Sequence, residues 1–259
     1  MQQDMRDTAI FEMAYDLAIF GAASVQVYGG SGYYNLGYWD ENLPALPGNM
    51  STAAANLARR HLLSEDHAAT HQVTSVLDVA CGLGATTALF SQHYPNAKIT
   101  GINISKRQLE AASVRCPQAH FIQMDATKLA FADASMDRIH CVEAAFYFDT
   151  RLDFLKEARR VLRPHGRIIL TDIIYRSTLG LQIPASAARI DPQSYLADVR
   201  AAGLRVQRFE DITRRTADPF VEVLDQLGHS LWSRLIKRAI AGYYLVELEP
   251  DPYVNSSGQ

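Results

Sequence analysis

The strongest chemical signal in this 259-residue sequence is a short loop with two glycines that follows a buried apolar run. The run at 73–79 leads into Asp78-Val79-Ala80-Cys81-Gly82-Leu83-Gly84, and a helical pattern starts at Ala85. Because Gly82 and Gly84 lack a Cβ atom, the backbone can turn sharply there and let a ligand approach closely. The N-terminus of the following helix presents free N–H groups. The loop therefore predicts a ligand-binding turn between a first strand and a first helix.

Two common ligands of such a turn do not suit this sequence. A dinucleotide site has a third glycine where Thr87 stands, and an acid at the end of the second strand, where Asn103 stands. A P-loop ends in Gly-Lys-Ser or Gly-Lys-Thr, and no such sequence follows here. Both nucleotide-binding interpretations are therefore disfavoured.

Strands alternate with helices through the middle of the chain. Apolar runs that predict strands lie at residues 73–79, 97–102, 120–123, 138–142 and 167–174. Helical patterns cover residues 85–92 and 152–162, and a further helix opens at Ser105. This alternation predicts a Rossmann-like, doubly wound α/β fold with a mostly parallel sheet and right-handed crossovers.

The chain divides into three parts on this pattern. Residues 1–71 contain helical patterns around a loop rich in glycine and aromatic residues, and residues 72–175 form the strand–helix core. Residues 176–259 contain a variable stretch, a helix with Asp191 as N-cap, and then strand, helix and strand. The late strands, predicted at 204–212 and 243–248, are expected to complete the sheet.

Several motifs of the core resemble those of class I S-adenosylmethionine-dependent methyltransferases, in the family's order. Residues 78–84 look like the first motif, 124–126 like the third-strand motif, and 161–167 like the "vLrPGG" turn, with His165 replacing its first glycine. Residues 101–105 with Gln108 resemble the branch that holds sugar, polyketide and terpenoid methyltransferases and cyclopropane fatty acid synthases. The resemblance spans residues 15–248. It is specific for the cofactor, S-adenosyl-L-methionine, and says little about the substrate.

The resemblance implies a seven-stranded sheet with helices on both faces, an N-terminal helical cap with a cofactor-covering loop, and a lid after the fifth strand. The lid would occupy residues 175–190, where Leu179, Leu181, Ile183 and Pro184 suit an apolar substrate. A helical apolar stripe from Phe220 to Trp232 suits the same purpose. For both stretches the alternative is ordinary core.

The resemblance also implies a set of cofactor contacts in the loop and after the next two strands. These are Asp78, Ala80, Gly82, Gly84, Asn103, Ile104, Gln108, Asp125 and Ala126. Asp78 would order the loop and the methionine amino group, and Asp125 would accept from the adenine amino group. Asn103 stands where most of the family has an acid that binds the ribose, but an amide can both accept and donate.

Each of these polar residues also has a structural alternative. Asp78 could cap the loop, and Asp125 could be a solvated turn acid. Ser105 and Gln108 have the spacing of a helix capping box, which competes with ribose contact by Gln108.

An aromatic segment at residues 31–39 is a further candidate for the cofactor site. In the resembling branch such a segment closes over the cofactor, and aromatic faces suit a sulfonium cation. Tyr33, Tyr38 and Trp39 are the residues expected to contact it. A packed surface loop is the alternative, with Tyr38 and Trp39 in the core.

The segment 143–148 follows the fourth strand, where the methyl group leaves the cofactor in such folds. Glu143 is expected to contact the cofactor and, with Tyr147, to act in catalysis; Asp172 is a further candidate base. Many members of the branch carry a histidine at the position of Tyr147. A tyrosine with an ordinary pKa near 10 is a poor base at neutral pH, so Tyr147 would rather orient a substrate hydroxyl.

Composition excludes several classes of function. The net charge of −3 and pI of about 6.2 provide no basic field for nucleic acid. The three cysteines lack metal or disulfide spacing, so no metal is expected and a reducing compartment fits. The N-terminus does not resemble a signal peptide, and the apolar stretch at 17–25 is too short to cross a membrane. We expect a cytoplasmic monomer or homodimer without membrane partners.

The sequence thus predicts methyl transfer from S-adenosyl-L-methionine to a small, hydrophobic natural product, by in-line displacement aided by alignment and exclusion of water. An oxygen or carbon acceptor is favoured slightly over nitrogen. The alternative is an enzyme of the same fold that uses bound cofactor as a scaffold for another reaction, such as a cyclisation. A non-catalytic partner would be expected to have a degraded glycine loop, and this loop is intact.

Overall fold

The computed structural model describes residues 2–63, 70–181, 183–184 and 191–253. In the described residues before the core, the α-helices are α1 (Gln2–Ile19), α2 (Ala22–Tyr28) and α3 (Met50–Arg60). The core then alternates β1 (Ser75–Val79), α5 (Ala85–His93), β2 (Lys98–Asn103), α6 (Lys106–Arg115), β3 (His120–Gln123), β4 (Met136–Val142), α7 (Arg151–Val161) and β5 (Leu162–Tyr175). The last part contains α8 (Pro192–Ala201), β6 (Leu204–Asp211), α9 (Ala217–Gln226), α10 (Ser230–Ala239) and β7 (Ile240–Pro250).

The seven strands form one sheet in the order β3-β2-β1-β4-β5-β7-β6. The pairs from β3 through β5 are parallel, whereas β7 runs antiparallel to both β5 and β6. The predicted doubly wound, mostly parallel sheet is therefore confirmed. The strand order changes direction at the centre of the sheet, because β2 lies on one side of β1 and β4 lies on the other. Such a point leaves a crevice at the carboxyl ends of the two adjacent strands, here β1 and β4.

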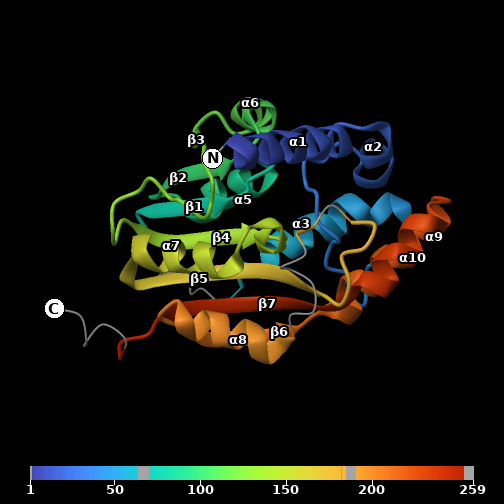
Figure 1. Cartoon of the computed structure of the whole chain (residues 1–259). Helices are drawn as coiled ribbons and strands as arrows, with labels where there is room; N and C mark the ends of the chain where they lie inside the picture. The colour runs from blue at the N-terminus through green and yellow to red at the C-terminus, as the bar shows by residue number, and fades with distance from the viewer. Residues whose placement is uncertain (1, 64–69, 182, 185–190, 254–259) are drawn as a thin grey trace.

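Alternating side chains of β5 show that helices cover both faces of the sheet. Ile168 and Leu170 point into a core that includes residues of α7 and α8, while Ile169 and Ile173 point into a core formed with α3, α9 and α10. Since successive strand residues face opposite sides, a strand buried on both sides is largely apolar, as residues 168–170 and 173–174 are. Figure 1 shows α7 and α8 in front of the sheet and α9 packed beside α10.

The structure corrects two local predictions. β5 begins at Leu162, directly after α7, so the predicted turn at 161–167 is divided between the last residue of the helix and the first six residues of the strand. The predicted helical stripe from Phe220 to Trp232 is two helices, because Gly228 (φ 81°) turns the chain between α9 and α10. Phe220 is buried, but Leu231 is 68% exposed. Of the predicted lid, residues 182 and 185–190 lie outside the described part.

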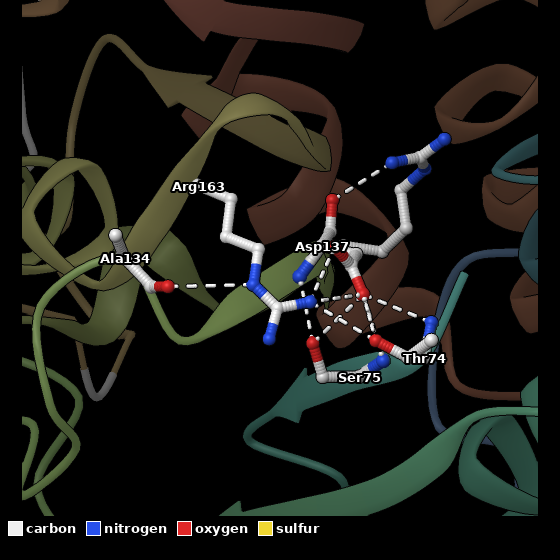
Figure 2. A network of polar contacts seen from close by, with 6 residues as sticks. Thr74, Ser75, Ala134, Asp137 and Arg163 are labelled. Carbon is white, nitrogen blue, oxygen red and sulfur yellow. Dashed lines mark hydrogen bonds and ion pairs between the residues drawn. The ribbon is translucent and has the colours of Figure 1, made fainter. Parts of the chain in front are cut away.

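One carboxylate joins three strands at the end of the sheet opposite the crevice (Figure 2). Asp137, in β4, accepts from the backbone N–H of Thr74 at 2.9 Å and of Ser75 at 3.0 Å, at the start of β1. Arg163, near the start of β5, donates to both oxygens of Asp137 at 2.7 and 2.8 Å. Partial burial acts to raise the pKa of Asp137, but the hydrogen bonds from Arg163, Thr74 and Ser75 outweigh it and hold this pKa at about 2.

We expect Arg163→Ala to lower the free energy of unfolding at pH 7 by about 1 kcal/mol, because Asp137 loses its only paired cation among the described residues. The carboxylate stabilises the fold above its ordinary pKa of 3.8, and this contribution is lost as the pH falls through about 2. The difference between variant and wild type in urea titrations should therefore narrow between pH 4 and pH 2. Lys156→Ala, which removes an exposed pair at 4.0 Å, is the control and should change little. A pH-independent difference would contradict the assignment.

Candidate functional site

A cavity of about 610 Å³ lies at the carboxyl ends of β1, β2 and β4. Ten of the residues singled out from the sequence line it: Tyr33, Ala80, Gly82, Asn103, Ile104, Gln108, Asp125, Ala126, Glu143 and Tyr147. The remaining predicted residues are Tyr38, Trp39, Asp78 and Gly84, which do not line it. The sheet therefore brings most of the predicted site together, as expected where parallel strands end side by side.

The two glycines of the loop after β1 serve different purposes. Both have positive φ, 53° at Gly82 and 80° at Gly84. A Cβ atom on Gly84 would lie 2.9 Å from the Cα and Cβ atoms of Ala112 in α6, whereas one on Gly82 would meet nothing within 4 Å. Gly84 thus allows close packing behind the loop, and Gly82 leaves the cavity side open to a ligand.

Asp78 supports the loop from behind rather than facing the cavity. Its side chain is 1% exposed, and its Oδ2 accepts from Thr86 Oγ1 at 2.7 Å and Thr87 Oγ1 at 2.6 Å. These bonds tie the end of β1 to the first turn of α5. Burial raises the pKa of Asp78 to about 7, although the two threonine hydroxyls act to lower it. Contact of Asp78 with the cofactor stays a prediction.

The second-strand motif is held by an acid from the N-terminal helix. Asn103 Nδ2 donates to Gln108 Oε1 at 3.0 Å, and Gln108 Nε2 donates to Asp16 Oδ1 at 2.7 Å. Ser105 caps α6 by accepting from the backbone N–H of Gln108, and its hydroxyl donates to Asp16 at 2.8 Å. The capping bond predicted from Ser105 and Gln108 therefore coexists with a cavity-lining position for Gln108.

Asp16 was missed in the sequence, as were Tyr15 and Ile19, which line the cavity from the same helix. The spacing of Tyr15 and Ile19 by four residues was the available signal, because it puts both on one face of α1. Asp16 brings a buried carboxylate next to Asn103, where most of the family has its acid on the second strand.

In the aromatic segment at residues 31–39, the residues that line the cavity come earlier in the chain than predicted. Tyr33, Tyr34 and Asn35 line the cavity. At Gly37 (φ 77°) the chain turns, and Tyr38 and Trp39 pack against the core beside α3 instead. Trp39 is 2% exposed and donates from Nε1 to the Leu36 carbonyl at 3.0 Å. These positions fit the alternative of a place in the core, and cofactor contact by Tyr38 and Trp39 stays a prediction.

Glu143 presents a half-buried carboxyl group to the cavity, directly after the end of β4. Its backbone adopts the left-handed region with φ 54°, which is uncommon for a residue with a side chain. Oε2 accepts from the backbone N–H of Leu36 at 2.7 Å and from the hydroxyl of Tyr243 at 2.5 Å. Among the described residues no hydrogen bond reaches Oε1. Burial raises the pKa of Glu143 to about 8, although both hydrogen bonds act to lower it.

The other two candidate bases are less suited to take a proton. Burial raises the pKa of Tyr147 well above 10, and its ring packs edge-on against Tyr15 with centroids 5.3 Å apart. Asp172 is 1% exposed and accepts from Arg151 Nε at 2.7 Å, so this carboxylate is committed to a buried ion pair. The geometry favours Glu143.

The chemistry of the lining fits S-adenosylmethionine. Gln108, Asn103 and Asp125 provide amide and carboxylate groups at one end, as a ribose and an adenine amino group require. Aromatic rings of Tyr15, Tyr34 and Tyr147 surround the other part, which suits a sulfonium cation. No cluster of three or more histidines, cysteines or acids that could hold a metal ion occurs in the described ranges. Likewise, no helix there has the length and apolarity needed to cross a membrane.

Residues 77–170 match the family model described as a methyltransferase domain. Methyltransferase GfsG of Streptomyces halstedii is 31% identical over 198 residues, which cover 70% of this chain and 68% of that protein. O-methyltransferase cnsE of Penicillium expansum is 30% identical over 79% of this chain and 76% of its own. The 27-O-demethylrifamycin SV methyltransferase of Amycolatopsis mediterranei is 28% identical, with 73% of each chain covered.

Two solved structures share the fold over 94% of this chain. A geranyl diphosphate methyltransferase in complex with GPP and sinefungin has a TM-score of 0.75 at 17% identity, with 99% of that chain covered. The [4+2]-cyclase SpnF has a TM-score of 0.71 at 22% identity, with 96% of that chain covered. At these identities the likeness concerns the fold.

We expect Asp16→Ala to weaken binding of S-adenosyl-L-homocysteine about tenfold in calorimetric titrations. The substitution removes the acceptor of Gln108 and Ser105 and frees Gln108 to leave the cavity wall. Met13→Ala, on the exposed side of the same helix, is the control and should bind as the wild type does. Unchanged affinity in folded Asp16→Ala protein would show that this acid does not support the site.

We further expect Glu143 to make the cofactor-free protein less stable at alkaline pH. Because its folded pKa of about 8 lies above the ordinary 4.5, its stabilising effect is complete below pH 4.5 and lost as the pH rises through about 8. The loss approaches about 1.4 kcal/mol per pH unit. In urea titrations at pH 5.5 and 8, Glu143→Gln should show a smaller fall than the wild type. Glu110→Gln, which changes an exposed carboxylate, should show the same fall in stability as the wild type. An equal fall in all three proteins would contradict the raised pKa of Glu143.

Proposed function

The chain belongs to the S-adenosylmethionine-dependent methyltransferases, and we propose that it methylates a hydroxyl oxygen of a small, neutral and largely apolar natural product. The observation that carries this proposal is the Glu143 carboxyl group at the cavity wall. It combines a raised pKa, two fixed hydrogen bonds to Oε2 and an uncommitted Oε1 among the described residues. A base poised near the working pH is what a hydroxyl acceptor requires.

The cofactor, when bound, supplies a methyl group on a positively charged sulfur with a good leaving group. The remaining work of the chain is to position groups and exclude water. Asn103 and Gln108 would hold the ribose hydroxyls, and Asp125 the adenine amino group. Glu143 Oε1 would accept the proton of the substrate hydroxyl while Tyr243 and the Leu36 N–H stabilise the negative charge on Oε2.

The names of relatives support an oxygen acceptor. Several relatives are named O-methyltransferases, and the name 27-O-demethylrifamycin SV methyltransferase specifies methylation of an oxygen on a complex natural product. The resemblance of the second-strand motif to methyltransferases of secondary metabolism supports the same class. An amine acceptor would need no base, so a buried base favours oxygen over nitrogen.

The charges that line the cavity favour a neutral acceptor. Asp125, Glu143, Asp149 and Asp153 provide four acidic groups, and among the described residues that line the cavity Lys128 is the one lysine or arginine. A phosphorylated substrate would meet like charges there without a pair of cations to bind it. The expected substrate therefore differs from geranyl diphosphate, for which the structural neighbour is named. The rings of Tyr147 and Phe148, together with Pro184, instead provide apolar surface for an uncharged molecule.

The test is to incubate the purified protein with S-adenosyl-L-methionine and a panel of hydroxylated macrolides, phenols and terpenoid alcohols. We expect release of S-adenosyl-L-homocysteine together with a product heavier by one methylene group. Glu143→Gln should lower kcat by about 10²–10⁴, the usual contribution of a general base, while its affinity for S-adenosyl-L-homocysteine changes little. Glu110→Gln is the matched exposed control.

Undiminished kcat in Glu143→Gln would remove the proposed base. A rearranged product without release of S-adenosyl-L-homocysteine would instead support use of the cofactor as a scaffold.

A further inference from the structure

Thr86 provides a hydroxyl group at the cavity wall whose hydrogen is already committed. The residue lies in the first turn of α5, is half-buried and lines the cavity. Its Oγ1 donates to Asp78 Oδ2 at 2.7 Å and makes no other hydrogen bond among the described residues. A hydroxyl has one hydrogen and two lone pairs, so Oγ1 can offer only an acceptor to a ligand in the cavity.

A second hydroxyl fixes the direction of this hydrogen bond. Thr87 Oγ1 donates to the same oxygen of Asp78 at 2.6 Å. With Asp78 ionised, both hydroxyls must donate, because a carboxylate oxygen carries no hydrogen. Thr87 is 0% exposed and does not line the cavity. Of the two threonines, Thr86 is therefore the one that connects Asp78 to the cavity.

The charge of Asp78 reaches the cavity although its side chain does not line it. Burial is the main cause that raises the pKa values of Tyr33 and Cys81, and the Asp78 charge raises both further. Both of these residues line the cavity. A hydroxyl that donates to a carboxylate is also polarised into a better acceptor. This part of the wall thus suits a cation with N–H groups, whereas an anionic group would be repelled by Asp78.

A second acceptor lies in the loop that precedes Thr86. Ala80 lines the cavity with its backbone in the left-handed region, at φ 56°. Its carbonyl oxygen receives no hydrogen bond among the described residues. An ammonium group has three hydrogens to donate, so it needs more than one acceptor. The Ala80 carbonyl and Thr86 Oγ1 together provide two.

The strand order places these acceptors at a particular end of the cofactor. Asp125, expected to bind the adenine amino group, follows β3, and Asn103, expected to bind the ribose, ends β2. The sheet runs β3-β2-β1, so the loop after β1 comes next along the same edge. In S-adenosylmethionine the chain that continues from the ribose ends in an α-amino acid, which carries an ammonium and a carboxylate. The amino-acid end therefore lies where Thr86 is.

We propose that Thr86 Oγ1 accepts a hydrogen bond from the α-ammonium of the cofactor, and that Asp78 is a positioning residue that acts through Thr86 rather than by direct contact. The inference rests on the cavity being the cofactor site. It goes beyond the proposed function, because it depends neither on Glu143 nor on the acceptor atom of the substrate.

The test is calorimetric titration with three ligands that share the thioadenosine part and differ at the other end. S-adenosyl-L-homocysteine has the ammonium and the carboxylate, S-adenosyl-3-thiopropylamine has only the ammonium, and 5′-methylthioadenosine has neither. Thr86→Val keeps the shape of the side chain and removes the hydroxyl. We expect it to weaken binding of the first two ligands about tenfold and to leave 5′-methylthioadenosine unchanged. Thr86→Ser, which keeps the hydroxyl, should restore binding of both.

Thr87→Val is the matched control, because it removes the other hydroxyl from the same oxygen of Asp78 but nothing from the cavity wall. Its affinities for the three ligands should keep the ratios of the wild type. A role of Thr86 in loop structure alone would instead change the affinities for all three ligands by a similar factor.

Three results would overturn the inference. They are equal losses for all three ligands in Thr86→Val, no loss for any of them, and a loss confined to S-adenosyl-L-homocysteine, which would assign Thr86 to the carboxylate. Absence of S-adenosyl-L-homocysteine binding by the wild type would remove the premise and the inference together. Failure of the proposed oxygen acceptor appears only in the assays with substrates, so it is distinguishable from all of these results.

Discussion

Partial burial of one carboxyl group, directly after β4, is the constraint that the rest of the site is built around. Glu143 accepts hydrogen bonds from the loop after α2 and from β7, residues that lie 107 and 100 positions away in the sequence. A buried carboxyl without such partners would be strongly destabilising. The N-terminal segment and the last strand are therefore both required for the same chemical group, and the cavity contains contributions from all three parts of the chain.

The two ends of the central strands differ in how fully their polar groups are satisfied within the protein. At one end Asp137, Arg163 and the start of β1 form a closed polar network that needs nothing from a ligand. At the other end the same strands finish in groups that are only partly satisfied within the protein, such as Glu143 Oε1 and the open side of Gly82. Because the network around Asp137 makes the strands rigid at the first end, polar groups at the second end can remain available to a ligand. Such preorganised groups need not move during the reaction.

Local signals in the sequence predicted the fold well. β3 was predicted with its observed bounds, and Asp191 caps α8 as expected, because a short apolar run or an Asp–Pro pair needs only its immediate neighbours. Most of the predicted site residues that line the cavity follow β1, β2, β3 and β4 directly, and their contact with the cofactor stays a prediction. The roles of Asp16 and Tyr243 could not be predicted, because their hydrogen bonds join residues 89 to 100 positions apart. Gly228 was a recognisable helix break. The turn at Gly37, after which Tyr38 and Trp39 no longer line the cavity, was not recognised.

The position of β7 between β5 and β6 has a consequence for synthesis on the ribosome. Strands β1 to β5 can pair in parallel as they emerge, but β6 has no neighbour in the sheet other than β7, which is translated after it. Until β7 inserts, the edge of β5 stays open to pairing with other chains. Helix α8 is translated before the strands that it will cover have reached their final order. The same insertion delivers Tyr243 to Glu143. Completion of the sheet and completion of the reactive centre are thus one late event, so a nascent chain acquires its chemistry only when its aggregation-prone edge has been closed.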